Sequence, residues 1–238
     1  MADYKNTEGF LRLKQELMAF EALTGLDNVY TEEIISKYKL YYSYPIYSNI
    51  DMPTGFIGKT LDSFICANES HRVIVDLIKQ CPWKWYLLTG NPGIGKTHLG
   101  IGAMISAMGG NSKKGRYDTA EAIFLRIKAH NGCESEVVEN LSGIDILIID
   151  ECEGEKITAF SDDSIKGVFQ EIIMRRDIAK KQTIIIGNKP EEVKKIIGNN
   201  GYSRFEGRGE VINLTSEAWV DYRPKIKKEA NTAADTPF

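Results

Sequence analysis

A short glycine-rich stretch limits what this chain can fold into more than any other feature of its sequence. Residues 90–97 read GNPGIGKT, which has every fixed residue of the pattern GxxxxGK[ST]. An apolar run, YLLT, comes directly before it, and a segment with an apolar stripe, 96–108, follows. Glycines let backbone N–H groups wrap closely around an anion, and the first turn of a helix adds partial positive charge. The pattern and its context predict a strand, a phosphate-binding loop and a helix, rather than a glycine-rich turn without a ligand.

The side chains of this loop suit a nucleoside triphosphate with a magnesium ion. The ammonium group of Lys96 is expected to reach the β and γ phosphates, and the Thr97 hydroxyl to ligate Mg²⁺. The expected nucleotide contacts are Gly90, Asn91, Pro92, Gly93, Ile94, Gly95, Lys96, Thr97 and His98. A second GKT sequence, at 58–60, has Pro53 where the first glycine of the pattern belongs and has no strand before it, so it is assigned to a linker.

Polar residues end two further apolar runs. The run 145–150 reads DILIID, which is typical of a central parallel strand, and Glu151 follows it. Since ligands lie at the carboxyl edge of open α/β sheets, Asp150 is expected to hold Mg²⁺ and Glu151 to deprotonate an attacking water. The second acid favours hydrolysis over phosphate transfer to a small acceptor. Asn188 follows the run 183–187 and is expected to hydrogen-bond the water or the γ phosphate. The alternatives are an acidic strand end that caps a turn and a turn-forming asparagine.

Helical and strand patterns alternate along the chain from about residue 60. Helices are predicted over 68–80, 96–108, 119–129, 163–179 and 190–197, and strands over 85–89, 116–118, 145–150, 183–187 and 210–214. This alternation is typical of an α/β three-layer sandwich with a parallel sheet. The expected divisions are a small helical N-terminal region with a linker over 1–55, a nucleotide-binding domain over 56–223 and a flexible tail over 224–238.

Composition excludes several classes of protein. Hydrophobic residues make up 42% and charged residues 26%, which suits a packed core and excludes wholesale disorder. The formal net charge is −3, so any contact with nucleic acid needs a local basic patch. No apolar run is long enough to span a membrane, the N-terminus lacks an apolar signal core, and none of the four cysteines forms a CxxC pair. We expect a cytoplasmic protein without a zinc site or a disulfide framework.

The N-terminal region has an apolar stripe and a tyrosine cluster. The members of the stripe recur at helical spacing: Phe10, Leu13, Leu17 and Phe20. Thr31 is the expected N-cap of a second short helix. The cluster consists of Tyr38, Tyr41, Tyr42, Tyr44 and Tyr47. Because aromatic residues supply a large contact area, both features form a candidate docking surface for a partner; the alternative is that they pack on the nucleotide-binding domain.

Several arginines are candidates for a role in a neighbouring subunit. Arg204 follows an expected glycine-rich loop, 198–201, and an exposed guanidinium there could enter the next subunit's nucleotide site and stabilise transition-state charge. Arg208 and the pair Arg175–Arg176 are the competing candidates. The alternative for all of them is an ordinary solvated position at a helix end.

The order of these pieces resembles that in one group of proteins. GNPGIGKTHL, LIIDE, a helix ending in MRRD, IIIGNKP, and YSRF followed by a strand and DYR occur in this order in bacterial and phage replicative helicase loaders of the DnaC/DnaI type and in IstB-like transposition helpers. Both are AAA+ ATPases. The resemblance covers about residues 60–223. The first two motifs are common to AAA+ ATPases, whereas the order and spacing of the later pieces are more specific.

The resemblance implies an ATP site between subunits. It implies a five-stranded parallel sheet with the strand order 5-1-4-3-2, counted from the strand before the phosphate loop, and no C-terminal helical lid. The implied roles are Walker A for Lys96 and Thr97, Walker B for Asp150 and Glu151, sensor 1 for Asn188, and arginine finger for Arg204. The implied cofactors are ATP and Mg²⁺.

Two activities follow from the resemblance. The first is an ATP-dependent loader that binds a replicative hexameric helicase through 1–55, binds single-stranded DNA through its ATPase domain, and self-associates through the ATP site. In this family a helical element after the second strand touches DNA. The matching stretch, 112–130, carries five basic and two acidic residues. The expected DNA contacts are Lys113, Lys114, Arg126 and Lys128; the alternative is a solvated helix face.

The second activity is that of an IstB-like transposition helper ATPase, which would share the ATPase core and differ in its partner. Two other classes stay open. A P-loop nucleotide kinase is disfavoured by the Asp150–Glu151 pair and by the position of Asn188. An adaptor without enzymatic activity would bind ATP and turn it over slowly.

Overall fold

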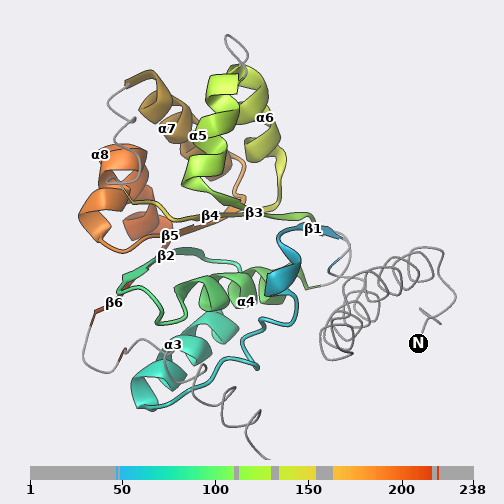
Figure 1. Ribbon diagram of the computed structural model, residues 1–238, viewed down its shortest axis with the longest axis vertical. Coiled ribbons are helices and arrows are strands. Elements are labelled where there is room, and N and C mark those ends of the chain that lie inside the picture. The colour runs from blue at the N-terminus through green and yellow to red at the C-terminus, as the bar shows by residue number, and fades with distance from the viewer. Residues whose placement is uncertain are drawn as a thin grey trace, which may run out of the picture.

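A six-stranded parallel sheet forms the centre of the molecule (Figure 1). The computed structural model describes residues 47, 49–109, 113–129, 134–153, 163–215 and 219, and of residues 163 and 164 the backbone alone. The strand order is β1-β3-β4-β5-β2-β6, and every neighbouring pair is parallel. The strands are β1 (Ile50–Asp51), β2 (Trp85–Gly90), β3 (Gly115–Thr119), β4 (Ile146–Asp150), β5 (Gln182–Ile186) and β6 (Gly209–Leu214).

Helices cover both faces of the sheet, so the domain has three layers. In Figure 1, α5, α6, α7 and α8 lie on one face and α3 and α4 on the other. The helices are the short 3₁₀ helix η3 (Thr54–Phe56), α3 (Glu69–Gln80), α4 (Lys96–Met108), α5 (Ala120–Ala129), α6 (Glu134–Gly143), α7 (Asp163–Ile178) and α8 (Pro190–Arg208). Right-handed crossovers between parallel strands produce such layers, because each connecting helix packs back onto the sheet.

The central strands β4 and β5 carry the apolar runs ILII and III because both of their faces are buried. In β4, Leu147 and Ile149 pack with the α5–α8 layer, whereas Ile146 and Ile148 pack with the α3–α4 layer. In β5, Ile185 packs with the α5–α8 layer and Ile184 with the α3–α4 layer. Alternate side chains of a strand point to opposite faces, so one run such as ILII supplies two cores.

The expected α/β fold with a parallel sheet is confirmed, with one correction to the strand count. The five predicted strands take the order β6-β2-β5-β4-β3, which is the predicted 5-1-4-3-2. The prediction of five strands is wrong, because β1 adds a sixth strand beside β3, with Ile50 opposite Gly115 and Asp51 opposite Arg116. A strand of two residues is too short to leave a periodic pattern. The helix α6 was also missed, since it buries only Val137, Val138 and Leu141.

The glycine-rich stretch before Arg204 is helical, which corrects the expected loop. The helix α8 breaks at Gly198, where φ is 72° and ψ is 170°, and then continues to Arg208. Arg204 therefore stands on a helix and not after a loop. The predicted helices within 1–46, the tail over 224–238 and the expected absence of a C-terminal lid all lie outside the described residues. Within the described ranges, no helix combines the length and the apolar character that crossing a bilayer requires.

Candidate functional site

An open pocket of about 940 Å³ lies at the carboxyl ends of β3, β4 and β5, where α4 begins. Three parts of the chain line it. They are the loop and first turn of α4 (92–98), the strand ends (Tyr117, Asp150, Glu151, Glu153, Gly187 and Asn188), and a segment before α3 (Phe56, Lys59, Ser63, Phe64, Ile65 and Ala67). The pocket thus has the position expected for a ligand site in an open α/β sheet. The phosphate-binding loop and the strand ends at Asp150, Glu151 and Asn188 were expected from the sequence. Tyr117, Glu153 and the segment before α3 were not.

Glycines give the phosphate-binding loop its shape. Gly95, the N-cap of α4, has a φ of 94°, and a Cβ on it would lie 2.7 Å from a ring carbon of Phe64. Gly90 has a φ of 142°, and its Cβ would lie 2.5 Å from the carbonyl oxygen of Leu214 in β6. Any other residue at these two positions would be both strained and crowded. The loop residues 92–95 and the first turn of α4 line the pocket.

Lys96 is almost buried, with 8% of its surface exposed. Its Nζ donates to the carbonyl oxygens of Gly90 at 2.7 Å and Asn91 at 2.8 Å, and to Asn188 Oδ1 at 3.0 Å. The ammonium group is thereby held between the phosphate-binding loop and the end of β5. Of the predicted nucleotide contacts, Gly90 and Asn91 bind this ammonium group, and residues 92–98 line the pocket.

Asp150 is enclosed by three hydrogen-bond donors. Its Oδ2 accepts from Thr97 Oγ1 at 2.7 Å and from the Tyr117 hydroxyl at 3.0 Å, and its Oδ1 accepts from the Glu151 N–H at 2.7 Å. Burial raises the pKa of Asp150, and the three hydrogen bonds oppose that rise. Mg²⁺ prefers oxygen ligands, and the Thr97 hydroxyl and the Asp150 carboxylate place two such oxygens side by side. The residues present therefore fit this ion.

Two acids follow the strand end. Glu151 is exposed on the pocket wall and has a φ of 54°, which is uncommon for a residue with a side chain. Glu153 also lines the pocket, and its Oε1 accepts from Asn188 Nδ2. The Asn188 amide therefore hydrogen-bonds both the Lys96 ammonium group and the Glu153 carboxylate. Glu153 was not predicted from the sequence, because it lies beyond the strand end and reaches the pocket through the path of the chain after β4.

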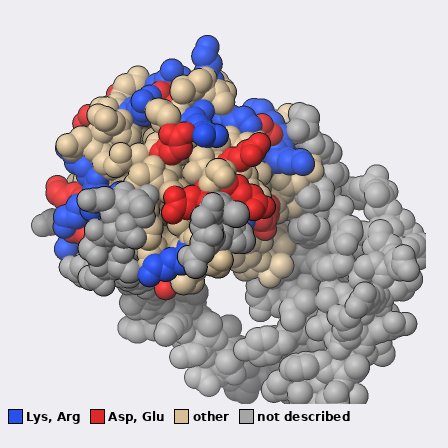
Figure 2. Space-filling model, turned by 90° about the horizontal axis from the view of Figure 1, so that it is seen from above, with Lys and Arg blue, Asp and Glu red and all other residues tan. Residues whose placement is uncertain are grey.

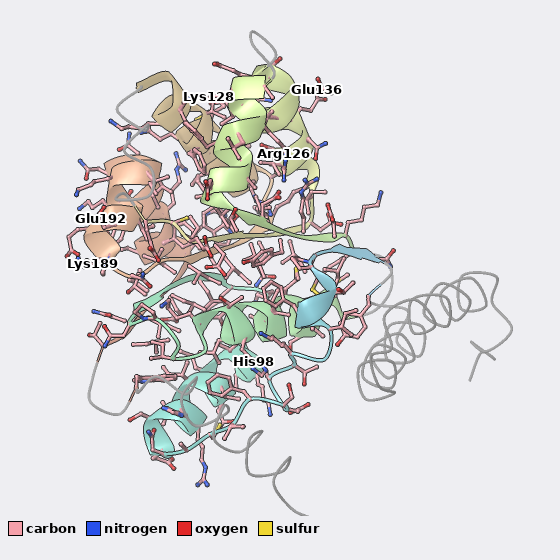
Figure 3. All side chains as sticks on the ribbon, viewed as in Figure 1. His98, Arg126, Lys128, Glu136, Lys189 and Glu192 are labelled. Carbon is pink, nitrogen blue, oxygen red and sulfur yellow. The ribbon has the colours of Figure 1, made fainter. Side chains whose placement is uncertain are left out.

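His98 connects α4 to the segment before α3; it is labelled in Figure 3. Its Nε2 lies 2.9 Å from the Thr60 carbonyl oxygen and 3.1 Å from Ser63 Oγ, and its ring meets the Phe64 ring edge-on at 5.2 Å. Burial lowers the pKa of His98. The GKT sequence at 58–60, which was assigned to a linker, thus lies beside the pocket: Lys59 lines it and Thr60 contacts His98. No motif in the sequence predicts this position.

The candidate arginines fall into two groups. Arg204 and Arg208 both bind Asp177: Arg204 Nη1 pairs with one carboxylate oxygen, and Arg208 Nε lies 2.5 Å from the other. Neither arginine lines the pocket of its own chain. Arg176 is completely buried, so the suggestion that it acts at a subunit interface is wrong. Its neighbour Arg175 is half exposed and pairs with Glu171 at 2.6 Å.

The candidate DNA-binding stretch, 112–130, is partly neutralised within its described residues. Arg126 pairs with Asp118, which also accepts from Arg116 Nε at 2.7 Å. Lys128 is exposed on α5, with its Nζ 4.5 Å from the centre of the Phe124 ring (Figure 3). Lys113 and Lys114 are exposed as well. Figure 2, which views the molecule from the α5–α8 side, shows basic side chains interspersed with acidic ones.

The phosphate-binding loop, the acidic strand end and the polar tip of β5 thus meet at one pocket. A family model described as IstB-like ATP binding protein matches residues 78–200. A protein named replicative helicase loader DnaC, from Buchnera aphidicola subsp. Baizongia pistaciae (strain Bp), is 25% identical over 228 residues, which cover 89% of this chain and 87% of that protein.

Two solved structures share the fold at low sequence identity. A structure of the DnaC helicase loader is 19% identical with a TM-score of 0.58, and the match covers 68% of this chain and 99% of that one. A DNA replication initiation factor is 22% identical with a TM-score of 0.56. That match covers 76% of this chain, which spans only 56% of the initiation factor.

Proposed function

The chain belongs to the family of IstB-like ATP-binding proteins, and from this premise we propose that it is an Mg²⁺-dependent ATPase that loads a replicative helicase onto single-stranded DNA. One observation carries the ATPase part of the proposal: Lys96, Thr97, Asp150 and Asn188 come from three separate segments and are joined by hydrogen bonds at a single pocket. A glycine-rich turn that bound nothing would not need these partners.

Binding of the triphosphate depends on the loop and on Lys96. The N–H groups of the loop and the N-terminus of α4 would cradle the phosphates. Lys96 would exchange bonds to the Gly90 and Asn91 carbonyls for bonds to phosphate oxygens, which are stronger because both partners are charged. Asn188, already hydrogen-bonded to Lys96, would stand beside the γ phosphate.

Hydrolysis depends on the strand ends. Thr97 and Asp150 would hold Mg²⁺, which neutralises charge on the phosphates when it is bound. Glu151 is exposed on the pocket wall, where its carboxylate would orient a water and accept its proton. Asn188 would hold the same water or the γ phosphate through its amide. Each of these roles uses a side chain that already lies at the pocket.

Self-association would complete the site. Arg204 lies outside the pocket of its own chain and keeps about a third of its side chain exposed (33%). Its bond to Asp177 fixes the direction of the guanidinium, which lowers the entropy lost when it meets a phosphate of the next subunit. Arg208, on the same carboxylate, is the alternative finger.

The loader is favoured over a transposition helper by the extent of the likeness. The similarity to the Buchnera helicase loader covers 89% of this chain, which is more than the predicted ATPase domain over 56–223 supplies. It therefore reaches into the N-terminal region, where we place helicase binding. The exposed Lys113, Lys114 and Lys128, with Arg126, would contact the phosphates of single-stranded DNA. The name of the family model keeps the transposition helper as the second candidate.

A partner test separates these candidates. The full chain is mixed with the purified replicative helicase and, separately, with a transposase from the same cell, each with ATP and Mg²⁺, and complexes are measured by size and mass. A loader binds the helicase, and replacing Leu13 and Leu17 by Asp abolishes the complex while ATP binding stays. Binding of the transposase alone would reverse the assignment. Phosphate transferred to a nucleotide, rather than released to water, would instead establish a kinase.

A further inference from the structure

Tyr117 contacts the proposed metal-binding carboxylate, although no motif assigns it a role. Tyr117 lies in β3 opposite Ile148 of β4, and Asp150 is two residues further along β4. The two side chains are therefore diagonal neighbours on one face of the sheet, a distance that only a long side chain bridges. The Tyr117 hydroxyl donates to Asp150 Oδ2 at 3.0 Å on the wall of the pocket.

The Tyr117 hydroxyl differs from that of Thr97 in having no expected bond to the metal ion. Asp150 Oδ2 accepts from both Thr97 and Tyr117. The Thr97 hydroxyl is expected to ligate Mg²⁺ through its oxygen, whereas the Tyr117 hydroxyl bonds the carboxylate alone. Tyr117, together with the Glu151 N–H on the other oxygen, therefore holds the carboxylate at its angle. A phenylalanine would fill the same space without this bond.

Tyr117 is itself held by the segment that leads into the domain. The Phe56 ring meets the Tyr117 ring edge-on, with centroids 4.9 Å apart. The strand β1, which precedes Phe56, pairs with the β3 residues Gly115 and Arg116 that precede Tyr117. Arg116 also contacts Asp51 of β1 at 3.5 Å. A shift of residues 50–56 against β3 would therefore move the Tyr117 hydroxyl relative to Asp150.

We infer that Tyr117 is a positioning residue for the metal-binding Asp150 and that Phe56 fixes Tyr117, so that residues 50–56 set the affinity of the site for Mg²⁺. The inference rests on the proposed ATPase function. It connects the junction between the N-terminal region and the ATPase domain to the site through contacts between side chains. Groups that orient a metal ligand typically contribute about 10–100-fold to metal affinity, and because Asp150 keeps its other donors the expected effect is about tenfold.

The test measures binding of the nonhydrolysable analogue AMPPNP to the full chain, first in EDTA and then over a series of Mg²⁺ concentrations. Tyr117→Phe is expected to leave the affinity in EDTA within about twofold of wild type and to raise the half-saturating Mg²⁺ concentration about tenfold. Phe56→Ala is expected to raise it about threefold, since Tyr117 keeps its hydroxyl but loses its support. The matched control is Tyr86→Phe, which removes a buried strand hydroxyl that donates to the Cys81 carbonyl at 2.6 Å.

Two results would overturn the inference alone, and a third would overturn the proposed ATPase function as well. Equal half-saturating Mg²⁺ for Tyr117→Phe and Tyr86→Phe would overturn the inference. An equal loss of AMPPNP affinity with and without Mg²⁺ would also overturn it, because it would show a purely structural role. If wild type bound AMPPNP and Lys96→Ala bound it equally well, the proposed ATPase function would fail, and the inference with it.

Discussion

Replacing Arg176 by methionine is expected to destabilise the domain strongly. The Arg176 guanidinium is fully buried and donates to Thr183 Oγ1 at 2.9 Å and to four backbone carbonyl oxygens. Those carbonyls belong to Leu141, Ile144, Asp145 and Gln182. The side chain thereby joins the end of α6 to the beginnings of β4 and β5. Burial lowers its pKa to about 9, so it keeps its proton near neutral pH.

The expected loss of stability follows from the buried carbonyl groups that methionine leaves without a hydrogen-bond donor. Each buried carbonyl left without a donor costs about 1–3 kcal/mol. Water entry and relaxation recover some of this, and the desolvation cost of the guanidinium disappears. Breaking a buried charged network typically costs about 3–5 kcal/mol. For a chain of this size, each kcal/mol lowers the melting temperature by roughly 2–4 °C. Arg176→Met should therefore lower it by about 6–20 °C.

Thermal unfolding followed by circular dichroism measures the shift, and the neighbouring residue supplies the control. Arg175→Met removes an exposed helical pair with Glu171, which is worth roughly 0.3–0.5 kcal/mol, so a shift of at most about 2 °C is expected. Folded Arg176→Met should still bind AMPPNP, because its bonds lie at the opposite edge of the sheet from the pocket. Equal shifts for the two variants would refute the reasoning.

The remaining predictions concern the site. Lys96→Ala should weaken ATP binding at least about tenfold, measured by equilibrium titration, because it removes charged hydrogen bonds to phosphate; unchanged affinity would contradict its role. Glu151→Gln should keep ATP affinity within about threefold and slow phosphate release about 10²–10⁴-fold; normal turnover would move the base elsewhere. Arg204→Ala should leave ATP binding by separate protomers intact and slow turnover of the assembly about 10³-fold; full activity would favour Arg208. The lowered pKa of His98 means that the unfolded chain takes up this proton first, so acidification below about pH 6.5 should cost stability. Urea unfolding between about pH 7.5 and 5.5 should show a smaller loss for His98→Gln than for wild type, and an equal loss would contradict the assignment.

The fold was predictable where local patterns are strong. The DILIID run of β4 and the glycine pattern before α4 each carry their own signal, because burial on both faces and phosphate binding restrict the residue types at every position. The strand β1 could not be predicted in this way. It consists of two residues that become a strand only by pairing with β3, which is a property of the folded chain.

The site residues that come from remote segments could not be predicted from the sequence either. Tyr117 and Phe64 look like ordinary core residues in sequence, and their positions at the pocket depend on strand register and on the path of the chain before α3. The adjacent arginines Arg175 and Arg176 look equivalent, yet the turn of α7 exposes one and buries the other. Burial at a helix end depends on the neighbouring elements, and a local pattern does not report them.

A crystal structure of the full chain with AMPPNP and Mg²⁺ tests the central claim most directly. The account predicts that the phosphates lie against the backbone N–H groups of 92–97, with Lys96 and Asn188 at the γ phosphate. It also predicts that the metal is bound by Thr97 and lies at Asp150, directly or through a water. Phosphates bound elsewhere, or a metal ion that contacts neither Thr97 nor Asp150, would contradict it.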